Sequence, residues 1–185
     1  MKREFQGMTL GLVALAMSFS SYAAHHEGAD ETKGLTKAVC VLKATEGNNV
    51  SGTVTFTQTE DGVLIEAHVM GLKPNSKHGF HIHQFGDISS PDGKSTGGHF
   101  NPAGHDHAGP DSAKRHVGDL GNLESDAKGH AMYKRVDKVI QIHGEHTILS
   151  RGITIHAGTD DMKSQPTGAA GARVAVGVIG VAKTE

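Results

Sequence analysis

The sequence predicts an all-β protein, an antiparallel sandwich or barrel that carries two long loops. The chain of 185 residues contains 25 glycines and no tryptophan. Many glycines in a chain whose apolar and polar residues alternate indicate short strands joined by frequent turns. No segment shows the 3.6-residue periodicity that is typical of an amphipathic helix. The length suits one domain with a sizeable hydrophobic core.

Eight segments have the composition and alternation of strands, and turn residues separate them. Glu60-Asp61-Gly62, for example, predicts a hairpin turn between the second and the third segment. Eight short strands without helices favour an antiparallel sandwich or barrel. The predicted strands are residues 37–44, 50–57, 63–70, 77–85, 129–135, 139–143, 152–156 and 173–182.

Two stretches, residues 86–119 and 157–172, lack this alternation and are predicted to be long loops. A loop of more than ~15 residues in a compact domain is usually functional. The first loop has few apolar residues to bury, so another interaction must fix it. A bound metal can do so, because its binding free energy becomes folding free energy of the segment it ties down. The candidate ligands in this loop are His99, His105, Asp106, His107, His116 and Asp119.

The first residues resemble an export signal. Lys2 and Arg3 precede an apolar run at residues 8–17, which is too short to span a bilayer. Ser21-Tyr22-Ala23 then offers small residues for cleavage after Ala23, and Ala24 is a second possible end. A retained membrane anchor is the alternative interpretation.

The chain is therefore divided into a signal peptide (1–23), a flexible polar tail (24–36) and one domain (37–185). Export predicts a periplasmic or secreted protein without stable membrane association after the signal is removed. The formal net charge is only −2, which argues against nucleic-acid binding.

Cys40 is the only cysteine of the chain, so no disulfide can form within it. It lies in AVCVLKA, where apolar residues alternate with others. This pattern favours a small buried side chain in a strand, and a reactive thiol is the alternative.

A His-x-His pair carries the first sign of chemistry. His81 and His83 flank Ile82 in a predicted strand, and residues i and i+2 of a strand point to the same face. HFNP (99–102), HAGPDSAKRHVGD (107–119) and ITIHAGTDD (153–161) add further histidines and aspartates. Three imidazoles and a carboxylate make a closed zinc site, whereas a planar set of imidazoles suits Cu(II).

GFHIHQFGD, HFNP, RHVGDLGN and GVIGVA stand in this order and spacing between residues 37 and 183. In these motifs the chain resembles the secreted form of the copper,zinc superoxide dismutase family. The resemblance implies an eight-stranded antiparallel Greek-key β-barrel and a homodimer. It also implies conversion of superoxide to dioxygen and hydrogen peroxide by Cu(II)/Cu(I) cycling beside a histidine-bridged zinc.

By position, the resemblance implies two ligand sets that share one histidine. The copper ligands would be His81, His83, His99 and His156. The zinc ligands would be His99, His107, His116 and Asp119.

Three further residues match functional positions of the family. Asp160 would join a copper-binding ring to a zinc-binding ring from outside both ligand sets. Arg173 and Thr167 would line the channel above the copper, with Arg173 attracting and docking the anionic substrate. His99, Arg173 and Thr167 are thus the expected catalytic residues.

The remaining histidines fall outside this pattern. His105 does not match the ligand spacing and is expected to be exposed. Cleavage after Ala23 would leave Ala-His-His, so His25 and His26 could chelate Cu(II) with the new amino terminus; a solvated tail is the alternative. The others are expected in structural or surface positions, namely His68, His78, His130, His143 and His146.

The chain departs from the family in two places. The family usually joins its first long loop by a disulfide to the strand that carries the channel arginine. Here the loop has no cysteine, and Val176 stands three residues after Arg173. We therefore expect zinc to hold the loop more nearly alone. The second loop is short, with only Lys163 as a positive charge, so steering of superoxide could be weaker or depend on other lysines.

Two other functions fit parts of the pattern. A copper or zinc buffer or chaperone on the same fold would have no need for Arg173 and Thr167 over the metal. A mononuclear zinc hydrolase would need an open zinc position and a general base, and no motif such as HExxH is present.

Overall fold

The structure is a computed structural model that describes residues 34–183. The predicted signal peptide, His25 and His26 lie outside the described residues, and only residues 34–36 of the predicted tail are included. Within the described part, no helix is long and apolar enough to cross a membrane.

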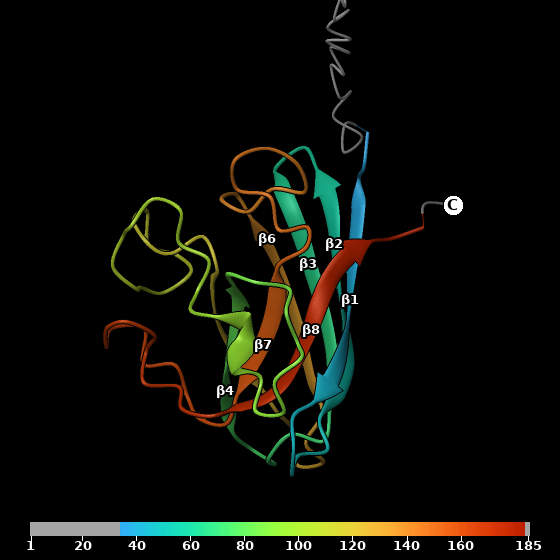
Figure 1. The fold of residues 1–185 in the computed structure, drawn as a ribbon, viewed down its shortest axis with the longest axis vertical. Coiled ribbons are helices and arrows are strands. Elements are labelled where there is room, and N and C mark those ends of the chain that lie inside the picture. Colours follow the sequence, from blue (N-terminus) through green and yellow to red (C-terminus); the bar gives the residue numbers. More distant parts are fainter. Residues whose placement is uncertain (1–33, 184–185) are drawn as a thin grey trace, which may run out of the picture. The chain divides into compact units, whose positions relative to one another are not determined.

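Eight antiparallel strands form one continuous sheet with the order β5-β4-β7-β8-β1-β2-β3-β6 (Figure 1). The sheet closes almost completely into a barrel, since the Tyr133 hydroxyl of β6 donates a hydrogen bond to the Leu120 carbonyl of β5 (2.9 Å). The all-β prediction is thus confirmed. The strands are β1 (Lys37–Ala44), β2 (Ser51–Thr59), β3 (Gly62–Met70), β4 (Lys77–His83), β5 (Asp119–Glu124), β6 (Ala131–Asp137), β7 (Gly152–His156) and β8 (Arg173–Val181).

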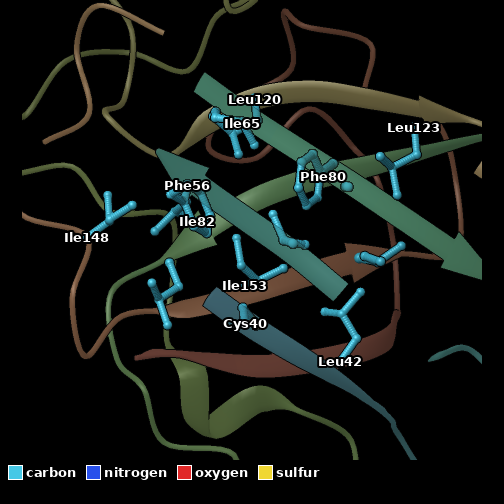
Figure 2. Packing of buried hydrophobic residues seen from close by; sticks show 14 of the residues in the cluster. Cys40, Leu42, Phe56, Ile65, Phe80, Ile82, Leu120, Leu123, Ile148 and Ile153 are labelled. Carbon is cyan, nitrogen blue, oxygen red and sulfur yellow. The ribbon is translucent and has the colours of Figure 1, made fainter. Parts of the chain in front are cut away.

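The barrel interior is filled by the apolar side chains of alternate strand positions (Figure 2). Phe56, Phe80 and Ile153 are completely buried, and Cys40 lies among them as a free cysteine. Burial raises the pKa of the Cys40 thiol to about 12, so the side chain stays protonated and inert. The prediction of a buried Cys40 is confirmed.

Two of the strand assignments need correction. The predicted strand 139–143 is an irregular segment with one isolated bridge, Gln141 to Thr147. Its Ile140 and Ile142 are buried, so the apolar alternation reflects burial without a sheet ladder. Conversely, β5 was not predicted, because Leu120 and Leu123 are both buried and break the alternation.

Both predicted long loops are present, as residues 84–118 (the first long loop) and 157–172 (the second long loop). The first contains one turn of 3₁₀ helix, Lys94–Thr96. It is fixed directly to β4: Ile82 donates to the Gly118 carbonyl (2.9 Å), and Phe100 donates to the Ile82 carbonyl (2.9 Å). The loop therefore lies against the strand that carries the His-x-His pair.

Gly118 is the tightest point of this attachment. A Cβ at position 118 would lie 2.0 Å from the Ile82 carbonyl oxygen, which is part of the backbone and cannot move aside. We predict that Gly118→Ala lowers the free energy of unfolding by about 3 kcal/mol through overpacking. Chemical denaturation measures this change.

Gly98→Ala in the same loop is the matched control, because nothing lies within 4 Å of a Cβ built there. Its effect should stay within about 0.5 kcal/mol. Equal stabilities of the two variants would contradict the proposed attachment.

Candidate metal centre

Four imidazoles from three parts of the chain meet at one side of the barrel. β4 presents His81 and His83 on one face, β7 ends in His156, and the first long loop supplies His99. The His81 and His99 ring centres are 4.0 Å apart, and the Nε2 atoms of His83 and His156 are 3.3 Å apart. All four rings are buried, and one nitrogen of each lies within 4.8 Å of the others.

Hydrogen bonds on the outer side of this group determine which ring nitrogens face inward. His83 donates from Nδ1 to the Gly97 carbonyl (2.9 Å). His156 donates from Nδ1 to the Gly171 carbonyl (3.0 Å). The Nε2 atoms of both rings are thereby left to face each other, with their lone pairs available to a metal.

The other two rings leave buried nitrogens without partners. His81 donates from Nε2 to Asp160 (2.8 Å), and its Nδ1 has no partner among the described residues. His99 Nε2 is likewise buried and unpartnered. Leaving a buried polar atom unsatisfied costs about 1–3 kcal/mol. A metal bound by these two nitrogens and the Nε2 atoms of His83 and His156 removes that cost.

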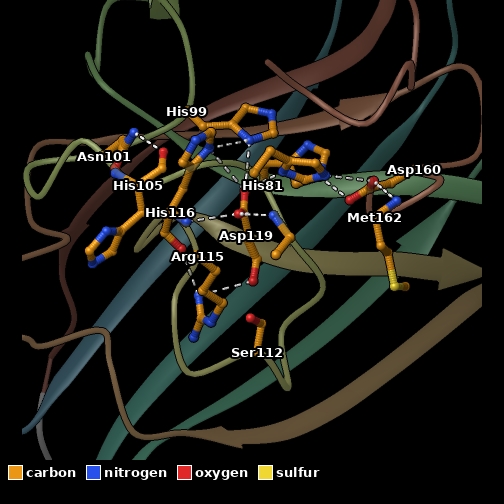
Figure 3. Close-up of polar contacts among 12 residues, drawn as sticks. His81, His99, Asn101, His105, Ser112, Arg115, His116, Asp119, Asp160 and Met162 are labelled. Carbon is orange, nitrogen blue, oxygen red and sulfur yellow. Dashed lines mark hydrogen bonds and ion pairs between the residues drawn. The ribbon is translucent and has the colours of Figure 1, made fainter. Parts of the chain in front are cut away.

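A second ligand group shares His99 with the first. His99 Nδ1 and His107 Nδ1 lie 2.8 and 2.9 Å from Asp119 Oδ1, and His116 Nδ1 lies 3.3 Å from the same oxygen. Figure 3 shows Asp119 beside His99 and His116. Three imidazoles and one carboxylate, all buried, are the donor set of a closed zinc site. His99 thus faces one group through Nε2 and the other through Nδ1.

Burial sets the charge of the first group. It lowers the pKa of His81 to about 3 and that of His156 to about 4, and it also holds the pKa values of His83 and His99 below the ordinary range. The four rings are therefore neutral near pH 7. A neutral imidazole has one free lone pair, so His81, His83 and His156 need not lose a proton to bind a metal, whereas His99 must lose one to bind through both nitrogens.

The pKa of His107, in the second group, is raised instead of lowered. Burial opposes its positive charge, but hydrogen bonds to Asp119 and Asp160 outweigh that effect and raise its pKa to about 9. Burial likewise opposes ionisation of Asp160, while hydrogen bonds from His107 and His81 hold its pKa below the usual range. Asp160 contacts both rings (2.9 and 2.8 Å) and so connects the two ligand groups.

An open cavity of about 630 Å³ lies against the first group. His83 and His156 line it from one side, and Thr167 and Arg173 contribute to its wall. Thr167 and Arg173 are therefore beside the imidazoles, where the sequence analysis expected them. Lys94 also lines the cavity and forms an ion pair there with Asp92 (2.8 Å), whereas Lys163 of the second long loop does not line it.

Arg173 also holds the first long loop. Its guanidinium donates to the Gly93 and Gly97 carbonyls (both 2.6 Å) and to the Thr96 hydroxyl (2.8 Å). Gly93 and Val176 are neighbours, since a Cβ built on Gly93 would lie 2.8 Å from Val176 Cγ1. Arginine hydrogen bonds thus supplement the metal ligands in fixing a loop that has no disulfide.

Sequence reasoning missed several residues that position the ligands. Asn122 of β5 exchanges two hydrogen bonds with the Asp160 backbone (2.8 and 3.0 Å). His78 donates from Nδ1 to the His156 carbonyl (2.9 Å). Arg115 donates to the carbonyls of His116, Val117 and Asp119 (2.9 to 3.0 Å). Asn122 and Arg115 lie within RHVGDLGN, but only the coordinates show their contacts.

His105 lies outside both groups, as expected from its spacing. It is exposed, its backbone is bound to the Asn101 side chain, and its ring points away from Asp119 in Figure 3.

Comparison with known proteins assigns the sequence of this chain to a family. The sequence model of the copper/zinc superoxide dismutase family (SODC) matches residues 50–179. The chain belongs to that family. A copper-zinc superoxide dismutase of Paramecium bursaria Chlorella virus 1 is 46% identical over 156 residues, 80% of this chain and 82% of that protein. Copper and zinc are accordingly the cofactors, and superoxide is the substrate.

A crystal structure of the clock protein EA4 has the same fold. It superposes with a TM-score of 0.73 at 41% sequence identity, over 80% of this chain and 95% of that one. The Greek-key barrel of the superoxide dismutase family is therefore confirmed for this chain.

The pKa values predict different pH dependences for the two ligand groups. In the metal-free protein His107 holds a proton below about pH 9, and zinc must displace it. Zinc affinity should therefore fall by up to about tenfold per pH unit as the pH drops from 8 to 6. Copper affinity of the zinc-free protein should change little over this range, because His81 and His156 protonate only near pH 3 and 4.

Competition titrations with chelators of known affinity, corrected for chelator protonation, measure both metals separately. An equal change of zinc and copper affinity between pH 8 and 6 would contradict the assignment of the proton to His107.

Proposed function

We propose that the chain dismutates superoxide with copper held by one ligand group and zinc by the other. The carrying observation is that His99 belongs to both groups while buried nitrogens of His81 and His99 lack partners among residues 34–183. The assigned copper ligands are His81, His83, His99 and His156. The assigned zinc ligands are His99, His107, His116 and Asp119.

The metals divide the chemistry, because bound copper can exchange an electron with superoxide, whereas zinc has no redox chemistry. The overall reaction converts two superoxide ions and two protons into one dioxygen and one hydrogen peroxide. His99 holds a proton at Nε2 between the two half-reactions, while its Nδ1 stays in the zinc group. Asp160 keeps the His81 and His107 rings in fixed orientations through its two carboxylate oxygens.

Arg173 docks the substrate. Its guanidinium lies in the wall of the cavity beside His83 and His156, and no carboxylate is among its hydrogen-bond partners in the described structure. A cation in the wall of a cavity raises the local concentration of a small anion and its rate of association, and here it acts against Glu46 and Asp92, which line the same cavity. Thr167 lines the same cavity and is assigned to restrict its width.

The Arg173→Gln variant tests this role. We predict that kcat/KM falls by about tenfold to a hundredfold and depends less on ionic strength, because the docking cation is lost. Pulse radiolysis at two salt concentrations measures both effects on protein of verified metal content.

Lys163→Gln removes an equal charge outside the cavity and is the matched control. Because Lys163 is exposed, solvent and salt screen its charge, and its loss should alter kcat/KM by less than about twofold. Equal kcat/KM values for both variants would exclude Arg173 as the docking residue.

We propose a homodimer as the assembly. Phe85 is 50% exposed and Val178 is 38% exposed, beside a surface hollow that Leu149 and Arg151 also line. Exposed apolar side chains grouped in this way favour burial against a second copy of the chain. Phe85→Asp should then shift the protein to a monomer in analytical ultracentrifugation. Met132→Asp, at a residue 77% exposed on β6, which pairs with neither β7 nor β8, should not.

The proposed location is the periplasm or the extracellular space. The support comes from Lys2, Arg3, the apolar run at residues 8–17 and the small residues before position 24. Mass spectrometry of the exported protein tests this, with a mature chain beginning at Ala24 or His25 as the expected result. A mature protein that keeps residues 1–23 would contradict it.

A further inference from the structure

A second group of metal-binding side chains lies on the outer face of the barrel, on strands β3 and β6. Met70 is 53% exposed and Met132 is 77% exposed. His68, opposite Met132 and two residues before Met70, is exposed as well and makes no side-chain hydrogen bond to another described residue. We call His68, Met70 and Met132 the outer Met–His group. None of these residues contributes to the metal centre described above.

The strand register brings these side chains together. His68 of β3 is directly opposite Met132 of β6. Residues in this relation have Cβ atoms about 4.5–5.5 Å apart, and their side chains share one face of the sheet. Met70 follows His68 by two residues and points the same way. Figure 1 shows the two strands side by side.

The next rung of the ladder shows that side chains on this face do meet. Glu66, two residues before His68, is opposite Lys134, and their charged ends form an ion pair of 2.9 Å. The positive charge that His68 can carry also contributes to lowering the Glu66 pKa, behind the larger contributions of Lys134. The His68 ring therefore lies near this pair on the same outer face of the sheet.

Neighbouring residues leave the group open. On β2, Ser51 pairs with Met70 and Thr53 pairs with His68, and both side chains are short and exposed. Met70 and Met132 stay 53% and 77% exposed beside them. Their exposure sets them apart from methionines that fill gaps in a core.

The donor atoms of these side chains indicate which metal ion the group would bind. Thioether sulfur is a soft donor that selects Cu(I), and imidazole also binds copper well, whereas hard cations such as Mg²⁺ and Ca²⁺ prefer oxygen. We propose that His68, Met70 and Met132 bind one Cu(I) ion through an imidazole nitrogen and two sulfur atoms. The site is separate from the buried centre and does not depend on the function proposed for it.

The test uses protein whose buried centre is already loaded with copper and zinc. Ag(I) serves as a redox-inert probe for Cu(I), and NMR of methionine methyl groups reports each thioether. We expect one Ag(I) per chain, with shifts confined to the Met70 and Met132 methyl groups. Met132→Leu, which keeps the apolar volume, should weaken Ag(I) binding at least about tenfold, and His68→Ala should do the same.

Met162→Leu is the matched control, because Met162 is an exposed methionine (38%) on the second long loop and lies outside the group. It should bind Ag(I) as the unchanged protein does. Cys40 does not compete, because its thiol is buried in the folded barrel. Unchanged Ag(I) binding by Met132→Leu, or equal shifts at Met162, would overturn the proposal. Anaerobic competition with a Cu(I) chelator must then give the same ranking of the variants for Cu(I) itself.

Discussion

The burial of a shared histidine between two groups of metal ligands is the constraint on which the rest of the structure depends. His99 places Nε2 among three neutral imidazoles and Nδ1 beside Asp119. Both nitrogens lie away from water, where a polar atom needs a partner. Hydrogen bonds within the protein satisfy the other sides of the surrounding rings, so the inward nitrogens are left for metals.

This arrangement requires a rigid support, and the barrel supplies it. The His-x-His pair lies on β4, which is paired on both sides and whose other face, at Ile82, is completely buried in the core. The first long loop is fixed to the same strand through Gly118 and Phe100. Arg173 then binds three groups of that loop while its guanidinium borders the cavity. Arg173 therefore both fixes the first long loop and presents a positive charge to the substrate.

Much of the fold could be predicted because most strands bury one face and expose the other. β5 does not alternate between buried and exposed residues in this way, because both its leucines are buried and Gly121 has a left-handed backbone conformation (φ 81°). Residues 139–143 showed the opposite error, because Ile140 and Ile142 are buried in an irregular segment. Periodicity reports burial of side chains, and it cannot distinguish a sheet ladder from another backbone that buries alternate residues.

The candidate site, too, could be predicted from the sequence only in part. The family resemblance implied the residues of the two ligand groups and Asp160, and the structure places these side chains together. The resemblance could not identify which ring nitrogen faces the metal, because that depends on hydrogen bonds to the Gly97 and Gly171 carbonyls, far along the chain. The contact between Asn122 and Asp160 likewise joins β5 to the second long loop and has no local signature.

Anomalous diffraction at the copper and zinc absorption edges, from crystals of the metal-loaded protein, tests whether His99 is shared by two metals. Two separate peaks are expected on either side of the His99 ring. Oxidised copper should be bound by His81 Nδ1 and the Nε2 atoms of His83, His99 and His156, and zinc by the group around Asp119. A copper peak away from His81 Nδ1, or one metal position alone in protein that contains both metals, would contradict this arrangement.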